Sequence, residues 1–247
     1  ITGSTGKTGT KNLAAAILSR RFAVHATPGN LNNHIGLPLT LLGMGGGEEI
    51  CVTEMGANHR KEIKALCEIA KPAIGVVTNV GPAHLEHFGT LKGVASAKAE
   101  LVEALPSEGT AVLPADDEFL PFLAERANAR TVTVGFSPTA DRRITGLERR
   151  EGGGYRFRVG DLPLETGRYG AHHVRNAAAA AVVGMIAGVP GGEIAAAVAE
   201  AKAEAGRGAV YDVDGVVLVD ESYNANPASM QAAVDAFMEM PGGGRRW

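Results

Sequence analysis

This sequence of 247 residues has few of the features that mark disulfide-bonded or membrane-embedded proteins. It contains two cysteines, Cys51 in an apolar run and Cys67 in a helical pattern, and neither has metal-ligand spacing. We expect both to be buried free thiols. No apolar run approaches the roughly 20 residues that a membrane-spanning helix needs, and no signal peptide is visible. We therefore expect a cytoplasmic protein with no membrane insertion.

The sequence also lacks an excess of positive charge. It has 24 lysines and arginines against 27 aspartates and glutamates, a net charge of −3 and a pI near 6.2. This balance gives no electrostatic footprint for a nucleic acid, so we expect no nucleic-acid partner. Because 45% of the residues are hydrophobic, the chain can bury the core of one large domain or two small ones.

What the sequence does contain is a glycine-rich turn at residues 2–8, Thr-Gly-Ser-Thr-Gly-Lys-Thr, followed directly by a helical pattern. Such a turn binds the phosphates of ATP or GTP through backbone N–H groups, a lysine and a Mg²⁺-binding hydroxyl. The longer form of the motif would have glycine where Ile1 stands, and a helix-capping turn is the alternative. The predicted phosphate-binding residues are Gly3, Ser4, Thr5, Gly6, Lys7 and Thr8.

The periodicity of the sequence predicts an α/β fold with a P-loop-type, mostly parallel sheet flanked by helices. Short β-branched runs at 23–26, 50–54, 74–79, 110–113 and 131–135 alternate with helical patterns at 7–21, 59–70, 91–105 and 118–128. Runs at 144–150, 155–159 and 162–166 then indicate a small antiparallel β-meander. Helices at 172–187 and 191–205, a hairpin at 210–219 and a helix at 224–240 complete the prediction.

Polar residues that follow the predicted parallel strands are candidates for chemistry, because ligands bind at the carboxyl ends of such strands. Glu54 closes one strand and could hold Mg²⁺, or serve as a helix N-cap or a surface acid. Asn79, His84 and Glu86 share the loop after the next strand. Lys98, by its position alone, is typical of a solvated lysine on a helix.

Three amide-rich segments could bind a polar substrate or a nucleoside, although each, taken by itself, is more typical of helix-entry chemistry. The segment at 27–36 could bind substrate, with candidates Asn30, Asn32, Asn33 and His34. Asn176 opens an alanine-rich helix and could contact adenine. The segment at 220–227 could contact ribose and base through Asp220, Glu221, Tyr223, Asn224 and Asn226. His172 and His173 lack the spacing of a helical metal site, and we predict no zinc there.

Taken together and in order, these blocks resemble the Mur ligase family. The matching blocks are residues 2–8, Glu-Met-Gly-Ala-Asn-His at 54–59, Asn-Val-Gly-Pro-Ala-His-Leu-Glu at 79–86, Ala-Lys at 97–98, Gly-Arg at 206–207 and Ser-Tyr-Asn-Ala-Asn-Pro at 222–227. The resemblance covers essentially the whole chain. The blocks at 54–58 and 223–227 point to the family branch that adds D-alanyl-D-alanine to a UDP-N-acetylmuramoyl tripeptide in peptidoglycan synthesis.

The resemblance implies a domain organisation. Family members have an N-terminal UDP-substrate domain, a central ATPase domain and a C-terminal domain. Residues 1–240 would be the central domain, and residues 241–247 a linker and the start of a truncated C-terminal domain, with the N-terminal domain absent. Ile1 would be the last residue of a strand, so we expect the chain to be a fragment whose partners include the missing domains.

The resemblance also implies roles for individual residues. Lys7 and Thr8 would hold ATP and Mg²⁺, Glu54 and His84 would help to bind the metal, and Lys98 would be carbamylated. Lys7, His84 and Lys98 would form the catalytic set. The adenosine would lie near Asn176 and the 221–226 segment, the phosphates near Arg207, and the UDP-linked peptide near residues 30–36. The chain departs from the family pattern at Gly9, His173 and Glu221, where threonine, asparagine and aspartate are expected; this leaves Asp220 or Glu221 as the ribose contact.

The expected activity is ATP-dependent amide ligation. The substrate carboxylate would form an acyl phosphate, and the amine of D-alanyl-D-alanine would displace the phosphate. The alternatives are another Mur-type ligase, acting on folate or another cell-wall polymer, and a non-catalytic nucleotide-binding module. A P-loop kinase or a GTPase is a further class, but the guanine-recognition motif Asn-Lys-x-Asp is missing.

Overall fold

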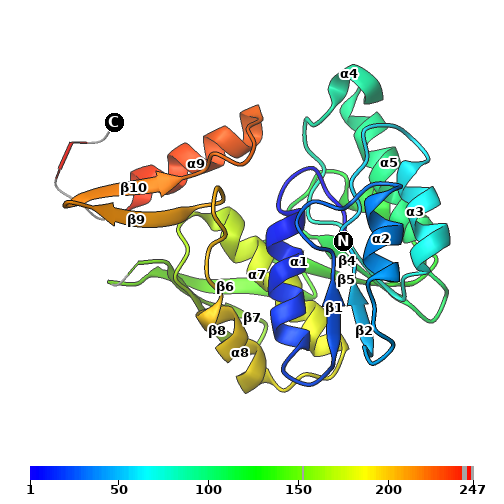
Figure 1. Cartoon of the computed structure of the whole chain (residues 1–247), viewed down its shortest axis with the longest axis horizontal. Helices are drawn as coiled ribbons and strands as arrows, with labels where there is room; N and C mark the ends of the chain where they lie inside the picture. Colours follow the sequence, from blue (N-terminus) through cyan, green and yellow to red (C-terminus); the bar gives the residue numbers. More distant parts are fainter. Residues whose placement is uncertain (152, 241–243, 246–247) are drawn as a thin grey trace.

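A twisted six-stranded sheet forms the centre of the computed structural model, which describes residues 1–151, 153–240 and 244–245 (Figure 1). Its strands follow the order β3-β4-β5-β6-β7-β8. Neighbours from β3 to β6 are parallel, and β6, β7 and β8 are antiparallel. The strands are β3 (Ile74–Val76), β4 (Thr110–Pro114), β5 (Arg130–Gly135), β6 (Arg142–Arg149), β7 (Tyr155–Val159) and β8 (Leu162–Thr166).

A second, parallel pair of strands is joined to this sheet through the first two residues. β1 (Val24–Ala26) pairs with β2 (Ile50–Val52). Thr2 forms a parallel bridge to Val77, and the carbonyl of Ile1 accepts a hydrogen bond from the N–H of Met55 at 2.8 Å. Residues 1–2 therefore occupy the strand position between β2 and β3, and the loop that follows them leaves from the carboxyl edge of the parallel strands.

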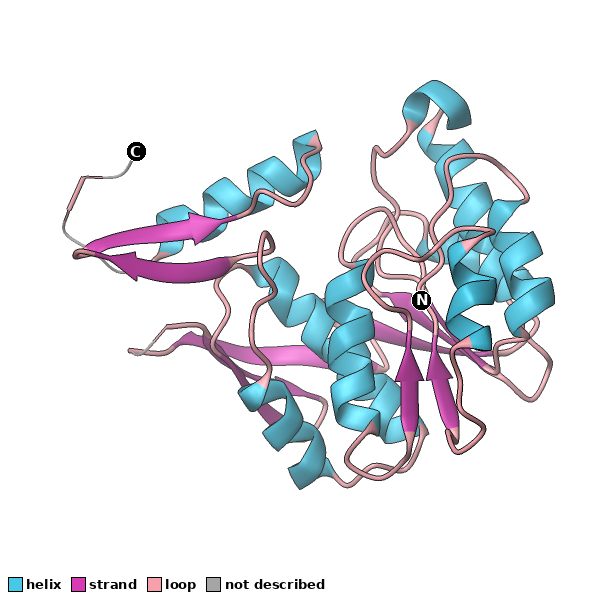
Figure 2. Ribbon diagram, in the orientation of Figure 1, coloured by secondary structure: helices cyan, strands magenta, loops and turns pink. Residues whose placement is uncertain are grey.

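Helices cover both faces of the sheet (Figure 2). In β4, Val112 packs into a core with α1 and α7, whereas Ala111 and Leu113 pack into a second core with α3 and α5. This alternation is the period of two expected for a strand buried on both faces. The helices are α1 (Lys7–Leu18), α2 (Gly36–Leu42), α3 (Glu62–Ala70), α4 (Leu85–Phe88), α5 (Leu91–Glu103), α6 (Leu120–Arg126), α7 (Ala171–Ile186), α8 (Gly191–Glu200) and α9 (Pro227–Glu239).

The last elements stand to one side of the central sheet (Figure 1). β9 (Ala209–Val213) and β10 (Val216–Asp220) form an antiparallel hairpin whose strands, within the described part of the chain, pair only with each other. Large apolar side chains of this unit remain exposed, including Val216, Leu218, Met230, Val234 and Met238. The hairpin and α9 are therefore packed less completely than the rest of the molecule.

The predicted fold class is confirmed, with differences in detail. The predicted meander is not a separate sheet but continues the main one, because β6 begins at Arg142 and pairs in parallel with β5. The short helices α2 and α4 were missed, since seven and four residues carry little periodicity. α3 begins at Glu62 and α9 at Pro227, each three residues after its predicted start, and α8 ends at Glu200, five residues before its predicted end.

Two smaller expectations can be compared with the structure. Cys67 is buried as expected, but Cys51 is only half-buried. Among the described residues, no helix has both the length and the apolar character to cross a bilayer. Of the predicted linker at 241–247, residues 241–243 and 246–247 lie outside the described residues.

Candidate functional site

The glycine-rich loop of residues 3–8, called the phosphate loop below, lies between residues 1–2 and the body of α1. At two of its positions neighbouring side chains leave no room for a β carbon. Gly6 caps α1 with φ 80°, and a β carbon there would lie 2.5 Å from Oδ1 of Asn176 on α7. A β carbon on Gly3 would collide with the hydroxyl of Thr78. α1 has no acidic residue in its first turn, so its first N–H groups and positive helix dipole are available to an anion.

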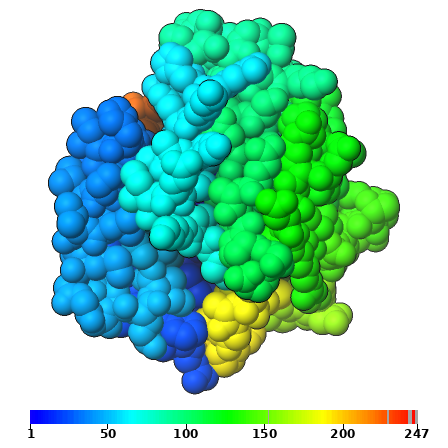
Figure 3. Space-filling view, turned by 90° about the vertical axis from the view of Figure 1, so that its right-hand side faces the viewer, coloured from blue at the N-terminus to red at the C-terminus, as the bar shows by residue number. Residues whose placement is uncertain are grey.

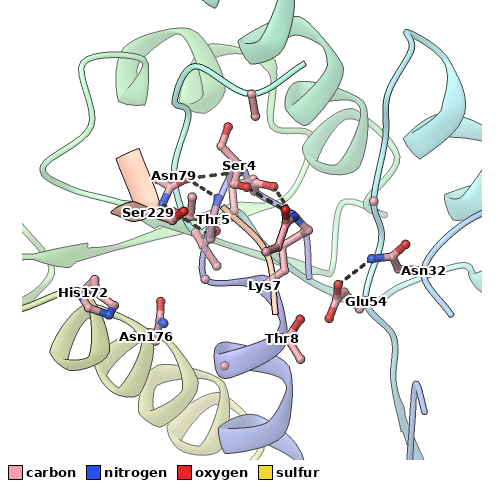
Figure 4. A pocket seen from close by; sticks show the side chains of 18 of the residues that line it. Ser4, Thr5, Lys7, Thr8, Asn32, Glu54, Asn79, His172, Asn176 and Ser229 are labelled. Carbon is pink, nitrogen blue, oxygen red and sulfur yellow. Dashed lines mark hydrogen bonds between the residues drawn. The ribbon is translucent and has the colours of Figure 1, made fainter. Parts of the chain in front are cut away.

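Asn79 fixes the shape of this loop (Figure 4). Its Oδ1 accepts hydrogen bonds from the N–H groups of Ser4 and Thr5 at 3.2 and 3.0 Å, and its Nδ2 donates to the hydroxyl of Thr5 at 2.7 Å. The adjacent Thr78 donates to the carbonyl of Thr5 at 2.6 Å. The end of β3 therefore holds the loop in place from the neighbouring strand.

Lys7 lies inside the loop. Its Nζ donates to the carbonyls of Gly3 at 2.9 Å and Ser4 at 3.4 Å. Burial lowers the pKa of Lys7, while the negative charge of Glu54 opposes this shift. The amine can exchange these carbonyl contacts for phosphate oxygens of a nucleotide in the loop.

Glu54 follows β2 and is a buried carboxylate with only 1% of its surface exposed. Its Oε1 accepts a hydrogen bond from Nδ2 of Asn32 at 2.7 Å, and its Oε2 has no hydrogen-bond partner among the described residues. Its backbone N–H donates to the hydroxyl of Thr27, whose carbonyl accepts a hydrogen bond from Nζ of the buried Lys11 at 2.7 Å. A buried carboxylate oxygen without a donor is a natural ligand for a hard cation.

Lys98 is 3% exposed on α5, so its interpretation as a solvated helix lysine is wrong. Helix α5 packs against α3, and Lys98 lines the pocket that residues 3–8 also line. Burial, with a smaller contribution from Lys7, lowers the pKa of Lys98 to about 7. His84 lines the same pocket, and burial, Lys7 and Lys98 lower its pKa in turn.

Residues from the hairpin and the loop before it face the other end of the pocket. The guanidinium of Arg207 lies 3.7 Å from the ring centroid of Tyr223. Glu221 lines the pocket, whereas Asp220 turns away and accepts hydrogen bonds from the N–H groups of Gly206 and Ser222. Asn226 caps α9, as its helix-entry alternative predicts.

His172, His173 and Glu221 bring possible metal-ligating atoms within 4.8 Å of one another in the described part of the chain. Burial lowers the pKa of His172 to about 4 and holds the pKa of His173 well below its ordinary value, and the positive charge of Arg168 contributes to both shifts. Arg168 also lies close to Glu221 around Gly208. The guanidinium of Arg168 would repel a metal cation at this cluster, so the cluster suits a neutral polar ligand better than a metal ion.

The asparagine-rich segment at 30–34 has a mixed outcome. Asn32 reaches Glu54, but Oδ1 of Asn33 accepts the N–H groups of Ile35 and Gly36 and thereby starts α2. The backbone carbonyl of Asn32 also accepts a hydrogen bond from the N–H of Gly56 at 2.8 Å. The segment therefore forms a pocket wall that is attached to the loop after β2.

One pocket of about 1200 Å³ brings nearly all of the predicted site residues together. It is lined by the phosphate loop, Asn30, Asn32, Asn33, His34, Glu54, His84, Lys98, Asn176, Arg207 and the hairpin residues, whereas Asp220 and Glu86 lie outside it. Sequence reasoning missed Lys11, Thr27, Thr78 and Arg168. The first three act through side-chain and backbone contacts between segments far apart in the chain, which no local pattern signals.

The fold and this pocket define a P-loop α/β domain, and comparisons with known proteins give its family. The family model of the Mur ligase middle domain matches residues 1–184. A UDP-N-acetylmuramoyl-tripeptide--D-alanyl-D-alanine ligase from Mycobacterium bovis is 40% identical over 243 residues, which are 96% of this chain and 48% of that protein. The chain therefore belongs to the Mur ligase family.

Solved structures agree with this assignment. MurF from Acinetobacter baumannii superposes with a TM-score of 0.91 at 32% identity, covering 98% of this chain and 54% of that one. MurF from Thermotoga maritima in complex with ADP gives 0.87 at 33% identity, covering 98% and 57%. The chain thus spans about half the length of the relatives that it matches.

Proposed function

We propose that this chain binds Mg-ATP and forms the ATP-using part of a ligase that adds D-alanyl-D-alanine to a UDP-N-acetylmuramoyl tripeptide. The observation that carries the proposal is the phosphate loop of residues 3–8 with Lys7 inside it and the buried Glu54 beside it. The names of the relatives support the reaction, and the ADP complex of the Thermotoga relative supports the nucleotide.

The protein groups divide into three sets in this proposal. The loop N–H groups and Lys7 bind the phosphates and stabilise the charge on the γ-phosphoryl group as the tripeptide carboxylate attacks it. Arg207 approaches the phosphates, and Tyr223, Asn224 and the neighbouring hairpin residues surround the nucleoside. Residues 30–34 position the peptide, so that the amine of D-alanyl-D-alanine can displace phosphate from the acyl phosphate.

The residues around Glu54 fit a magnesium ion. Oε2 of Glu54 is buried without a donor, and the hydroxyl of Thr8 lines the same pocket. These two oxygens would hold the ion, with His84 in contact directly or through water. A bound Mg²⁺ would neutralise charge on the β- and γ-phosphate oxygens.

Lys98 supplies a fourth metal-facing group if it carries a carbamate. A pKa of about 7 leaves a large fraction of the amine neutral near neutral pH, and a neutral amine can add CO₂. The addition releases one proton to solvent and leaves an anionic carbamate, which would replace the repulsion between Lys98 and Lys7 by an attraction. We therefore propose that Lys98 is carbamylated in the functional enzyme.

Calorimetric titration with Mg-ATP tests the proposed function. We expect the parent chain and the Lys92→Ala control, which changes an exposed lysine on α5, to bind with the same affinity. Lys7→Ala should show no measurable binding. Equal affinities of the Lys7→Ala variant and the parent would refute the assignment, and competition by GTP as strong as by ATP would argue for a different nucleotide.

A further inference from the structure

Lys61, which caps the start of α3, has a backbone conformation that is unfavourable for lysine. Its φ is 69°, in the left-handed region that glycine enters freely and a residue with a β carbon does not. Lys71, which caps the other end of α3, has a φ of 45°. Residues in this region persist only where their surroundings hold them, and they are frequent at functional sites.

The carboxylate of Glu100 on α5 holds Lys61 in this conformation. Its Oε1 accepts a hydrogen bond from the backbone N–H of Lys61 at 2.6 Å, and its Oε2 accepts one from the N–H of Lys64 at 2.9 Å. The first N–H groups of a helix lack acceptors within the helix, so Glu100 caps α3 from another helix. The direction in which the side chain of Lys61 leaves the backbone is therefore fixed.

Arg60 and Lys61 are two adjacent exposed cations that line the pocket, and the structure gives neither an ion-pair partner among the described residues. Two carboxylates of this region are already engaged by backbone groups. Glu100 caps α3, and Glu62 accepts the N–H of Asn58 at 2.7 Å. Both positive charges therefore remain available to a ligand.

The pair lies on a wall of the pocket that the segment at 30–34 also forms. The segment 55–70 adjoins the segment 30–45 on one face of the molecule (Figure 3), and the bond from the N–H of Gly56 to the carbonyl of Asn32 joins them. Residues 30–34 and 60–61 thus belong to the side of the pocket that the proposed function gives to the peptide substrate, whereas ATP is assigned to residues 3–8.

We propose that Arg60 and Lys61 together bind an anionic group of the UDP-linked substrate at this wall of the pocket. The inference rests on the proposed function, because that substrate carries anions of two kinds, a diphosphate and the carboxylates of its peptide. A guanidinium binds either group through paired N–H donors, and an ammonium adds a point charge. The strained lysine is then a specificity determinant for an acidic substrate.

Titration of the chain with two separate probes tests this inference and distinguishes the two anions. UDP carries the diphosphate without the peptide, and free alanyl-D-glutamyl-2,6-diaminopimelate, the peptide named for an Acinetobacter baumannii relative, carries the carboxylates without the diphosphate. Lys61→Gly and Arg60→Ala should each weaken binding of one probe about tenfold, the equivalent of 1.4 kcal/mol, and leave Mg-ATP affinity unchanged. The responding probe identifies the anion.

Matched variants separate the charge from the backbone strain. Lys61→Gly and Lys71→Gly should both keep or raise the melting temperature, because glycine suits a positive φ, but only the first should weaken probe binding. Lys61→Gln removes the charge but keeps a longer side chain than Lys61→Gly does, and it should weaken probe binding as much as Lys61→Gly. Lys64→Ala removes a charge that does not line the pocket and should have no effect.

Two results would overturn the inference without affecting the proposed function. One is binding of Mg-ATP by the parent chain with no binding of either probe. The other is probe binding that Lys61→Gly, Lys61→Gln and Arg60→Ala leave unchanged. Failure of the parent to bind Mg-ATP would instead count against the proposed function.

Discussion

The side-chain amide of Asn32 donates a hydrogen bond of 2.7 Å to Oε1 of Glu54, a residue 22 positions further along the chain. The Glu54 carboxylate is almost completely buried, and within the described part of the chain its other oxygen has no hydrogen-bond partner. One amide therefore both orients the proposed metal ligand and anchors the proposed substrate loop.

Asn32→Ala should destabilise the chain by about 1–3 kcal/mol, because it leaves the buried carboxylate without a donor on either oxygen. Chemical denaturation without divalent ions measures this difference. Added Mg²⁺ should reduce it if the ion binds Glu54. Asn30→Ala, which changes another amide of the same loop without touching Glu54, is the control, and an equal effect of both variants would contradict the role given to Asn32.

Lys98→Met should make the free energy of unfolding less dependent on pH. The folded-state pKa of Lys98, about 7, lies below its ordinary value of 10.5. The folded state therefore binds fewer protons between these values, and the contribution of Lys98 to stability rises with pH from about 7 to about 10. Relative to the parent, Lys98→Met should be most stabilising at pH 7 and below and should lose this advantage toward pH 10.

Denaturation curves in CO₂-free buffer at pH 7, 8.5 and 10 test this expectation. Each unit of pKa shift corresponds to about 1.4 kcal/mol, so the difference between the two proteins should change by several kcal/mol. Lys92→Met, on the exposed face of the same helix, should give a difference that is constant with pH. A constant difference for Lys98→Met as well would show that Lys98 titrates normally.

The contrast between Lys7 and Lys98 shows what sequence could predict. Lys7 belongs to a local motif in which the loop, the helix start and the lysine are contiguous, so its place could be derived from its neighbours. The burial of Lys98 depends on α3 and the phosphate loop, which lie far away in the sequence. The environment of Lys98 follows from how α5 packs against distant segments. In the sequence, only the family resemblance indicated a functional role for Lys98.

The hairpin shows the same limit for the fold. The pattern of residues 210–219 correctly predicted two strands, because two apolar runs flank a turn at Asp214 and Gly215. What packs against those strands is a tertiary property. The parallel pairing of β6 with β5 also could not be predicted from the sequence. It depends on a register in which Val134 of β5 lies opposite Arg142 of β6.

The β9–β10 hairpin should exchange its amide hydrogens much faster than β4 and β5. Its strands pair only with each other in the described part of the chain, and Val216, Val217 and Leu218 are more than half exposed, at 64%, 53% and 53%. An isolated two-stranded hairpin is marginally stable, and poorly packed elements open locally. Mass-spectrometric hydrogen exchange on the free chain measures this. Equal protection of β9–β10 and β4–β5 would contradict it.

Substitutions of Asn79 should separate the stability of the phosphate loop from its affinity for nucleotide. Asn79→Ala removes the acceptor for the N–H groups of Ser4 and Thr5 and the donor to the hydroxyl of Thr5. We expect it to destabilise the chain by about 1–3 kcal/mol. Asn79→Asp keeps an acceptor for both N–H groups, and the Thr5 hydroxyl can turn to donate to the new carboxylate, so the stability of this variant should be closer to that of the parent.

The order should reverse for binding of Mg-ATP. The carboxylate of Asn79→Asp would lie beside the loop that receives the phosphates, and its charge would repel them at a site where water screens poorly. Asn79→Asp should therefore bind Mg-ATP at least about tenfold more weakly than Asn79→Ala, a difference of 1.4 kcal/mol, although it is the more stable protein. Melting curves and calorimetry on the same samples measure both quantities. If the two variants ranked in the same order in both experiments, Asn79 would affect nucleotide binding only through the stability of the loop, and its position beside the phosphates would carry no electrostatic consequence.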